Sequence, residues 1–93
     1  MRTINRTSRF KKDYKRETRG QHRAVLDELL IGVASLLAAD VPLPEAMRDH
    51  ALAGEWKDHR DCHLKPDLVL IHRLPDVDTL ELVRLGSRSE LSL

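Results

Sequence analysis

Residues 21–39, QHRAVLDELLIGVASLLAA, hold the clearest helical pattern of the chain and decide where its core lies. Large aliphatic side chains recur there at three- and four-residue spacing, which places them on one face of an α-helix. Pro42 and Pro44 follow soon after, and proline cannot continue a helix. We therefore predict the main core helix over residues 21–39. The side chains expected on its buried face are Val25, Leu26, Leu29, Leu30, Val33, Leu36 and Leu37.

A shorter helix is predicted upstream, over a charged stretch that Gly20 ends. Thr7 or Ser8 stands where an N-cap residue is expected, just before this stretch. Phe10 and Tyr14 are four residues apart and therefore share one face of the helix. The other positions are mostly charged, so this helix contributes little more than these two aromatic rings to a core.

The remaining segments predict strands. Residues 2–6 are short and favour an edge strand, whereas residues 68–72, LVLIH, are almost continuously apolar and favour a central strand. Residues 79–85 alternate, with Leu80 and Leu82 on one face and Glu81 and Val83 on the other. The further expected elements are a strand over residues 56–64, turns at 65–67 and 76–78, and a last helical turn at 89–91. The fold class is therefore α+β: a short N-terminal strand, a helical hairpin, then an antiparallel β-sheet.

The formal net charge of +1 hides a strong asymmetry along the 93 residues. Residues 1–24 carry nine basic and two acidic side chains, a net +7, whereas residues 25–93 carry seven basic and thirteen acidic ones, a net −6. Such a basic segment favours binding to a polyanion such as RNA, although a solvated helix held by two aromatic rings fits the pattern equally well. The residues expected to contact phosphate there are Lys11, Lys12, Lys15 and Arg16.

Other counts exclude whole classes of protein. The length predicts one domain, residues 1–93. Cys62 is the only cysteine, so no internal disulfide can form. No apolar run approaches the roughly 20 residues that span a bilayer, and the N-terminus lacks the apolar stretch of a signal peptide. We therefore expect a cytoplasmic protein with no membrane association. Three aromatic residues are too few for a base-stacking sheet surface.

Four of the five histidines fall between positions 50 and 72. On a strand, His59, Asp61 and His63 point to one face, and Cys62 and Leu64 point to the other. The face of Cys62 and Leu64 suits the core, so the first three side chains are expected on an outward face. A metal site is one interpretation, but the spacing matches no closed zinc motif and Cys62 faces away from His63.

Metal-free RNA cleavage is a second interpretation. Histidine suits acid–base work near neutral pH, a neighbouring carboxylate can act as base or raise the imidazole pKa, and a cation stabilises the charged phosphate. The residues that could supply this chemistry are His50, His63, Asp67, Arg60 and Arg88. The third interpretation is that these are hydrated strand residues without a role, as we expect for His22 and His72.

A resemblance sharpens this choice. Residues 49–71, DHALAGEWKDHRDCHLKPDLVLI, resemble the YafQ branch of the RelE/ParE superfamily of bacterial type II toxins, whose pattern is DHxLxGxWxxxRDxHxxPDxxLIY. Residues 10–15, 42–44 and 84–87 are also similar to that family. The resemblance implies a RelE-like, microbial ribonuclease-like fold and a ribosome-dependent endoribonuclease that cleaves mRNA in the decoding site and inhibits translation. It implies no cofactor, a cognate antitoxin as partner, and contact with operator DNA only as the toxin–antitoxin complex.

The resemblance also implies roles for individual residues. His50, His63 and Asp67 match the acid–base residues of the family, with Trp56 and Asp61 also in the site. Arg60 matches a position expected to support the site or bind phosphate.

One position departs from the family pattern. Arg88 stands where the family has its third histidine, and Ser92 stands where an aromatic residue follows. Arginine keeps its proton, so Arg88 cannot act as a general acid or base, but it can neutralise a charged transition state. The alternative function is therefore a non-catalytic or attenuated module on the same fold, which inhibits a protein target or acts with its antitoxin as a corepressor. A zinc protein is a third alternative.

Overall fold

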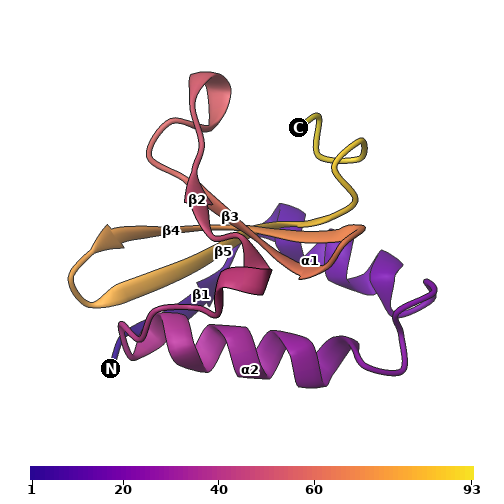
Figure 1. The fold of residues 1–93 in the computed structure, drawn as a ribbon, viewed down its shortest axis with the longest axis horizontal. Coiled ribbons are helices and arrows are strands. Elements are labelled where there is room, and N and C mark those ends of the chain that lie inside the picture. Colours follow the sequence, from indigo (N-terminus) through magenta and orange to yellow (C-terminus); the bar gives the residue numbers. More distant parts are fainter.

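A five-stranded sheet with two helices packed on one face organises the computed structural model, which describes residues 1–93 (Figure 1). The strand order is β1-β5-β4-β3-β2; β1 runs parallel to β5, and the other neighbours are antiparallel. This confirms the predicted α+β class. The elements are β1 (Thr3–Arg6), α1 (Ser8–Glu17), α2 (Leu26–Ala38), β2 (His50–Ala51), β3 (Arg60–Lys65), β4 (Leu68–Asp76) and β5 (Thr79–Gly86), with short 3-10 helices η1 (Glu45–Met47) and η2 (Gly54–Trp56).

The start of α1 is set by Thr7, one of the two residues predicted as its N-cap. Its hydroxyl oxygen accepts a hydrogen bond from the Phe10 amide at 3.0 Å, which satisfies one of the free N–H groups of the first turn. The same hydroxyl donates to the carbonyl oxygen of Val83 at 2.8 Å. Thr7 therefore caps the helix and ties its beginning to β5.

The core helix begins later than the sequence pattern predicts. Residues 21–25 form turns, and α2 starts only at Leu26. No side chain caps this helix, and the side chains of Gln21 and His22 bond Asp67 across the molecule. The prediction for residues 21–25 was wrong because this distant contact, which the sequence does not reveal, replaces the first helical turn.

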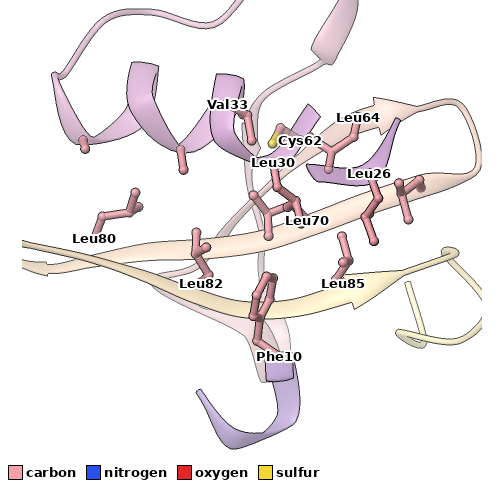
Figure 2. Packing of buried hydrophobic residues seen from close by; sticks show 13 residues of the cluster. Phe10, Leu26, Leu30, Val33, Cys62, Leu64, Leu70, Leu80, Leu82 and Leu85 are labelled. Carbon is pink, nitrogen blue, oxygen red and sulfur yellow. The ribbon is translucent and has the colours of Figure 1, made fainter. Parts of the chain in front are cut away.

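Two apolar clusters lie on opposite faces of the sheet, with β4 between them. The larger one joins α1 and α2 to the sheet; Figure 2 shows Leu30 of α2 near Leu70 of β4, with Phe10 near Leu82 and Leu85. The smaller one contains Val69, Ile71 and Leu91, flanked by Leu52, Trp56, Val83 and Leu93. Burial on both faces explains the apolar run of residues 68–72 and confirms the central position of this strand. No helix has the length and apolar character needed to cross a membrane.

The strand boundaries differ from prediction at two places. The strand predicted over residues 56–64 begins only at Arg60, because Gly54–Trp56 forms a 3-10 turn and Asp58 adopts a left-handed backbone with φ 68°. The second difference is that β4 continues past His72, where the predicted strand ends, to Asp76. The predicted alternation of residues 79–85 is confirmed, since Leu80 and Leu82 lie in the larger cluster and Val83 packs on the smaller one. Beyond β5, the Leu91 amide donates to the Ser87 carbonyl and closes a turn.

A buried carboxylate, Asp13, joins α1 to β5. It accepts hydrogen bonds from Arg84 Nε at 2.6 Å, from the Leu85 amide at 3.0 Å and from Arg16 Nη1 at 3.1 Å. Burial alone would raise the pKa of Asp13, but the bonds from Arg84 and Leu85 and the charges of Arg84 and Arg16 outweigh it, so the pKa is lowered. Asp13 is therefore ionised wherever the protein is folded at neutral pH.

Replacing this carboxylate should destabilise the protein. We expect Asp13→Asn to lower the free energy of unfolding at pH 7 by about 3 kcal/mol, because it leaves Arg84 without its buried partner. Since the folded-state pKa is lowered, this contribution is present above the ordinary Asp pKa and is lost as pH falls through the folded-state value. Urea unfolding at pH 7 and pH 3 measures both effects. Asp58→Asn, at an exposed carboxylate without an ion pair, is the matched control; an equal loss in both variants would contradict the role of Asp13.

Candidate acid–base centre

Asp61 lies at the floor of the candidate centre. Cys62 and Leu64 face the main core as predicted, so Asp61 and His63 lie on the opposite face of β3. That face is not outward, however: Asp61 is 0% exposed. It pairs with Ile71 of β4, and Leu91 and the partly buried Trp56 pack on this face of the sheet and form its cover. The expectation of an exposed Asp61 was therefore wrong. It failed because the cover comes from residues distant in the sequence.

The carboxylate of Asp61 has an unusual environment for a buried acid. Neither of its oxygens accepts a hydrogen bond. Burial raises its pKa, and the positive charges of His50, His63 and Arg88 offset this effect only in part. A buried carboxylate that lacks hydrogen bonds but faces two imidazoles and a guanidinium is typical of a functional site rather than of a stabilising contact.

His50 is held against Asp61 by the short strand β2, whose register pairs the two residues. Its Nδ1 lies 2.9 Å from Asp61 Oδ1 and 2.8 Å from the carbonyl oxygen of Arg48, which is its hydrogen-bond acceptor. Arg48 ends η1 in the left-handed region, with φ 50° and ψ 45°, and this directs its carbonyl to the ring. A neutral His50 therefore keeps its proton on Nδ1, which leaves Nε2 free to accept another.

His63 and Arg88 reach the centre through the register of the sheet. His63 on β3 pairs with Val69 on β4, and Val69 pairs with Gly86 on β5, two residues before Arg88. The three strands thus bring side chains from positions 63 and 88 to the same carboxylate. His63 is half-buried, and Arg88 is exposed and forms no ion pair, so its guanidinium is free to bind an anion.

Asp67 lies in the turn between β3 and β4 and has other partners. Its Oδ1 lies 2.7 Å from Nε2 of His22, and Gln21 donates to Oδ2. The hydrogen bond from His22 is the main cause of a lowered pKa, so Asp67 is ionised. Its hydrogen bonds go to the α1–α2 connection rather than to His50 or His63. His22, for which the sequence predicted no role, is thus the imidazole that Asp67 orients.

Asp49 is a residue that sequence reasoning did not single out. Its Oδ1 accepts a hydrogen bond from Arg60 Nε at 3.1 Å and lies 3.7 Å from Nε2 of buried His72. Burial lowers the pKa of His72 to about 4, so this ring is neutral and carries no charge for the site. Its place directly before His50 in the matched motif was the signal that could have identified Asp49.

The remaining candidates are Trp56 and the basic residues of α1. Trp56 is half-buried against the smaller cluster and meets the His59 ring edge-on, at 5.3 Å between centroids. Arg16 is held by Asp13, Glu17 and Glu90 and donates to the Leu85 carbonyl. The lysines of α1 form no ion pair and are exposed, which leaves them free to contact phosphate: Lys11, Lys12 and Lys15.

The structure also bears on metal binding. His, Cys, Asp and Glu side chains nowhere form a group of three or more that could hold a metal ion. Cys62 is fully buried, and burial raises the pKa of its thiol to about 12, so the sulfur stays protonated. This thiol belongs to the core.

Known proteins are similar to this chain in both fold and sequence. A model of the family "Bacterial toxin of type II toxin-antitoxin system, YafQ" matches residues 2–93. The chain is 33% identical over 90 residues to the mRNA interferase toxin YafQ of Escherichia coli K12, which covers 97% of this chain and 95% of that protein. A metal-bound toxin from Helicobacter pylori is 42% identical, with a TM-score of 0.82 over 98% of this chain and 99% of that one. A chain of the Escherichia coli DinJ–YafQ complex is 35% identical, with a TM-score of 0.80 over 98% of both chains. The chain therefore belongs to the YafQ family of toxins of bacterial type II toxin–antitoxin systems.

Proposed function

We propose that this toxin is a ribosome-dependent endoribonuclease that acts in the cytoplasm and cleaves mRNA in the decoding site, which stops translation. The observation that carries the proposal is the buried Asp61 carboxylate, which lacks hydrogen bonds and faces His50, His63 and Arg88. The relative of this toxin in Escherichia coli is named an mRNA interferase, which agrees with the proposed cleavage of mRNA.

The reaction needs a base, an acid and a cation. His50 takes the proton of the 2′-hydroxyl on its free Nε2, and the 2′-oxygen then attacks the adjacent phosphorus. The bond from phosphorus to the 5′-oxygen breaks as His63 gives that oxygen a proton, which leaves a 2′,3′-cyclic phosphate and a 5′-hydroxyl. Arg88 stabilises the negative charge that develops on the phosphate oxygens. Asp61 stabilises the imidazolium form of whichever ring has gained the proton.

Supporting roles fall to the other candidates. Asp67 either serves as a second base or orients a histidine, and its bond to His22 favours the orienting role. Arg60, held by Asp49, contacts a phosphate next to the scissile one, and Trp56 lines the site. The free lysines of α1, together with Arg16, contact ribosomal RNA. No metal or other cofactor takes part in the proposed reaction.

The partners follow from the family. A solved relative is part of the DinJ–YafQ toxin–antitoxin complex. We propose that this chain binds its own cognate antitoxin in the same way, and that it contacts operator DNA only within that complex.

Arg88 motivates a second candidate function. Because arginine cannot donate or accept a proton at working pH, a chain with Arg88 at this position fits an attenuated toxin or a non-catalytic binding module. Such a module would inhibit a protein target or act with its antitoxin as a corepressor. The free guanidinium beside Asp61 favours the catalytic proposal, because it suits charge stabilisation.

Cleavage should depend on both His50 and His63. We expect purified toxin to cleave mRNA on translating ribosomes in codon register and to leave free RNA intact. His50→Ala and His63→Ala should each reduce the cleavage rate by about 100-fold or more, since each removes a proton-transfer group. Primer extension on ribosome-bound mRNA measures the rate. His59→Ala is the matched control, because His59 bonds the Lys57 carbonyl outside the centre. Cleavage that survives in the double variant, His50→Ala with His63→Ala, would refute the assignment. A transition-metal chelator should not slow cleavage by the original toxin.

Arg88 separates the two candidate functions. In the catalytic proposal, Arg88→Ala reduces cleavage by about 100-fold, because it removes the cation that stabilises the transition state, and Arg88→His retains part of the rate. A large gain in Arg88→His over the original chain would instead identify the chain as an attenuated toxin. Lys57→Ala, at an exposed cation without an ion pair, controls for the loss of one positive charge.

Replacing Asp61 should reduce cleavage without reducing the stability of the fold. Asp61→Asn keeps the side-chain size but removes a buried negative charge, so the free energy of unfolding should stay equal or rise by up to about 1 kcal/mol. The raised folded-state pKa gives the same sign, because the neutral form is favoured in the folded protein. Cleavage should fall, because the charge that stabilises the imidazolium is removed. A loss of stability as large as that of Asp13→Asn would contradict this role.

A further inference from the structure

A cavity of about 540 Å³ opens beside the candidate centre, between η1 and the second half of β3. It exists because β2 pairs only with Arg60 and Asp61, so no strand covers the edge of β3 beyond them. The 3-10 turn η1 lies along that edge instead. The volume falls within the range of about 300–1,000 Å³ that is usual for small-ligand sites.

The walls of this cavity combine an apolar surface with free cations. Met47, Leu64 and Pro66 supply the apolar part. Arg48 and Lys65 also line it, and neither side chain forms an ion pair or a hydrogen bond. Such pairing is common elsewhere: Arg60, Arg73 and Arg84 each have a carboxylate partner.

The cavity also shares residues with the acid–base centre. His63 lines it, and the imidazole of the same residue acts on the Asp61 carboxylate. Arg48 also lines it, and the carbonyl oxygen of Arg48 holds the His50 ring. A ligand in the cavity therefore lies directly next to His63, and Arg48 connects the cavity to His50.

We propose that this cavity is a nucleotide subsite. A base packs on Met47, Leu64 and Pro66, because a flat aromatic ring and a thioether make favourable contacts. The attached phosphate lies between Arg48 and Lys65, whose free charges neutralise it. The identity of the occupant rests on the proposed function. If the toxin cleaves mRNA, the occupant is the mRNA nucleotide next to the scissile phosphate, and the subsite holds the RNA in register with His50 and His63.

Binding can be tested without ribosomes. Purified toxin is titrated with adenosine 5′-monophosphate, with adenosine and with inorganic phosphate, and amide shifts are followed by ¹H–¹⁵N NMR. We expect the nucleotide to shift the resonances of Met47, Arg48 and Lys65, and to bind at least about tenfold more tightly than phosphate, since the base adds apolar contact. Equal binding of phosphate alone, or shifts confined to α1, would overturn the subsite.

Variants make the test specific. Lys65→Gln and Met47→Ala should each weaken nucleotide binding by about fivefold or more, and Lys65→Arg should restore it. Lys57→Gln, which removes an exposed cation outside the cavity, should leave it within about twofold. Dispersed NMR spectra show that each variant is folded.

The ribosome assay separates this inference from the proposed function. If both hold, Lys65→Gln raises KM for mRNA cleavage and leaves kcat nearly unchanged. Nucleotide binding at Met47 and Lys65 in a protein that never cleaves mRNA would support the subsite and refute the proposed function. Cleavage that is insensitive to Lys65→Gln and Met47→Ala would refute the subsite alone.

Discussion

Asp13 receives hydrogen bonds from both ends of the chain, and the positions of the basic helix and of Arg88 both depend on it. The carboxylate lies on α1, and its donors Arg84 and Leu85 lie at the end of β5. Gly86 follows directly, and Arg16 approaches so closely there that a Cβ at this position would lie 2.6 Å from its Nη2 atom. Because Arg88 is only two residues further on, the same contact that holds α1 on the sheet also determines where that guanidinium enters the centre.

Asp13 and Asp61 are both buried aspartates, yet their pKa values shift in opposite directions. Asp13 accepts bonds from an arginine and a backbone amide and has a lowered pKa, whereas Asp61 accepts none and has a raised one. Burial acts on both, so the difference lies in the hydrogen bonds. A buried carboxylate with all its hydrogen bonds stabilises the fold, whereas one without hydrogen bonds destabilises it. Such a destabilising group is typical of a functional site. This contrast, rather than the histidines alone, distinguishes the candidate centre from the rest of the interior.

Much of this fold could be predicted from local pattern. Helical spacing identified α2, the Thr7 cap set the start of α1, and the apolar run of residues 68–72 identified the central strand. The errors share one physical cause, which is contact between residues far apart in the sequence. The bond of His22 to Asp67 replaces the expected first turn of α2, and Leu91 of the C-terminal segment packs on the face of the sheet in which Asp61 is buried. For the site, the motif indicated His50 and His63 and also contains Asp49, but the Arg48 carbonyl acts through backbone geometry that side-chain identity does not encode.

The charge asymmetry also acquires a different meaning once partners are counted. Within the basic N-terminal segment, Arg2 pairs with Asp40 and Arg16 is held by three carboxylates, so the other seven basic side chains supply its free charge. Lys12 and Lys15 line a groove with Glu90, which lies two residues beyond Arg88. Outside that segment, four cations have no partner, and three of them, Arg48, Lys65 and Arg88, border the candidate centre or its adjoining cavity; Lys57 is the fourth. Most of the free positive charge of this part of the chain therefore lies where an RNA backbone would pass, although the chain as a whole is nearly neutral.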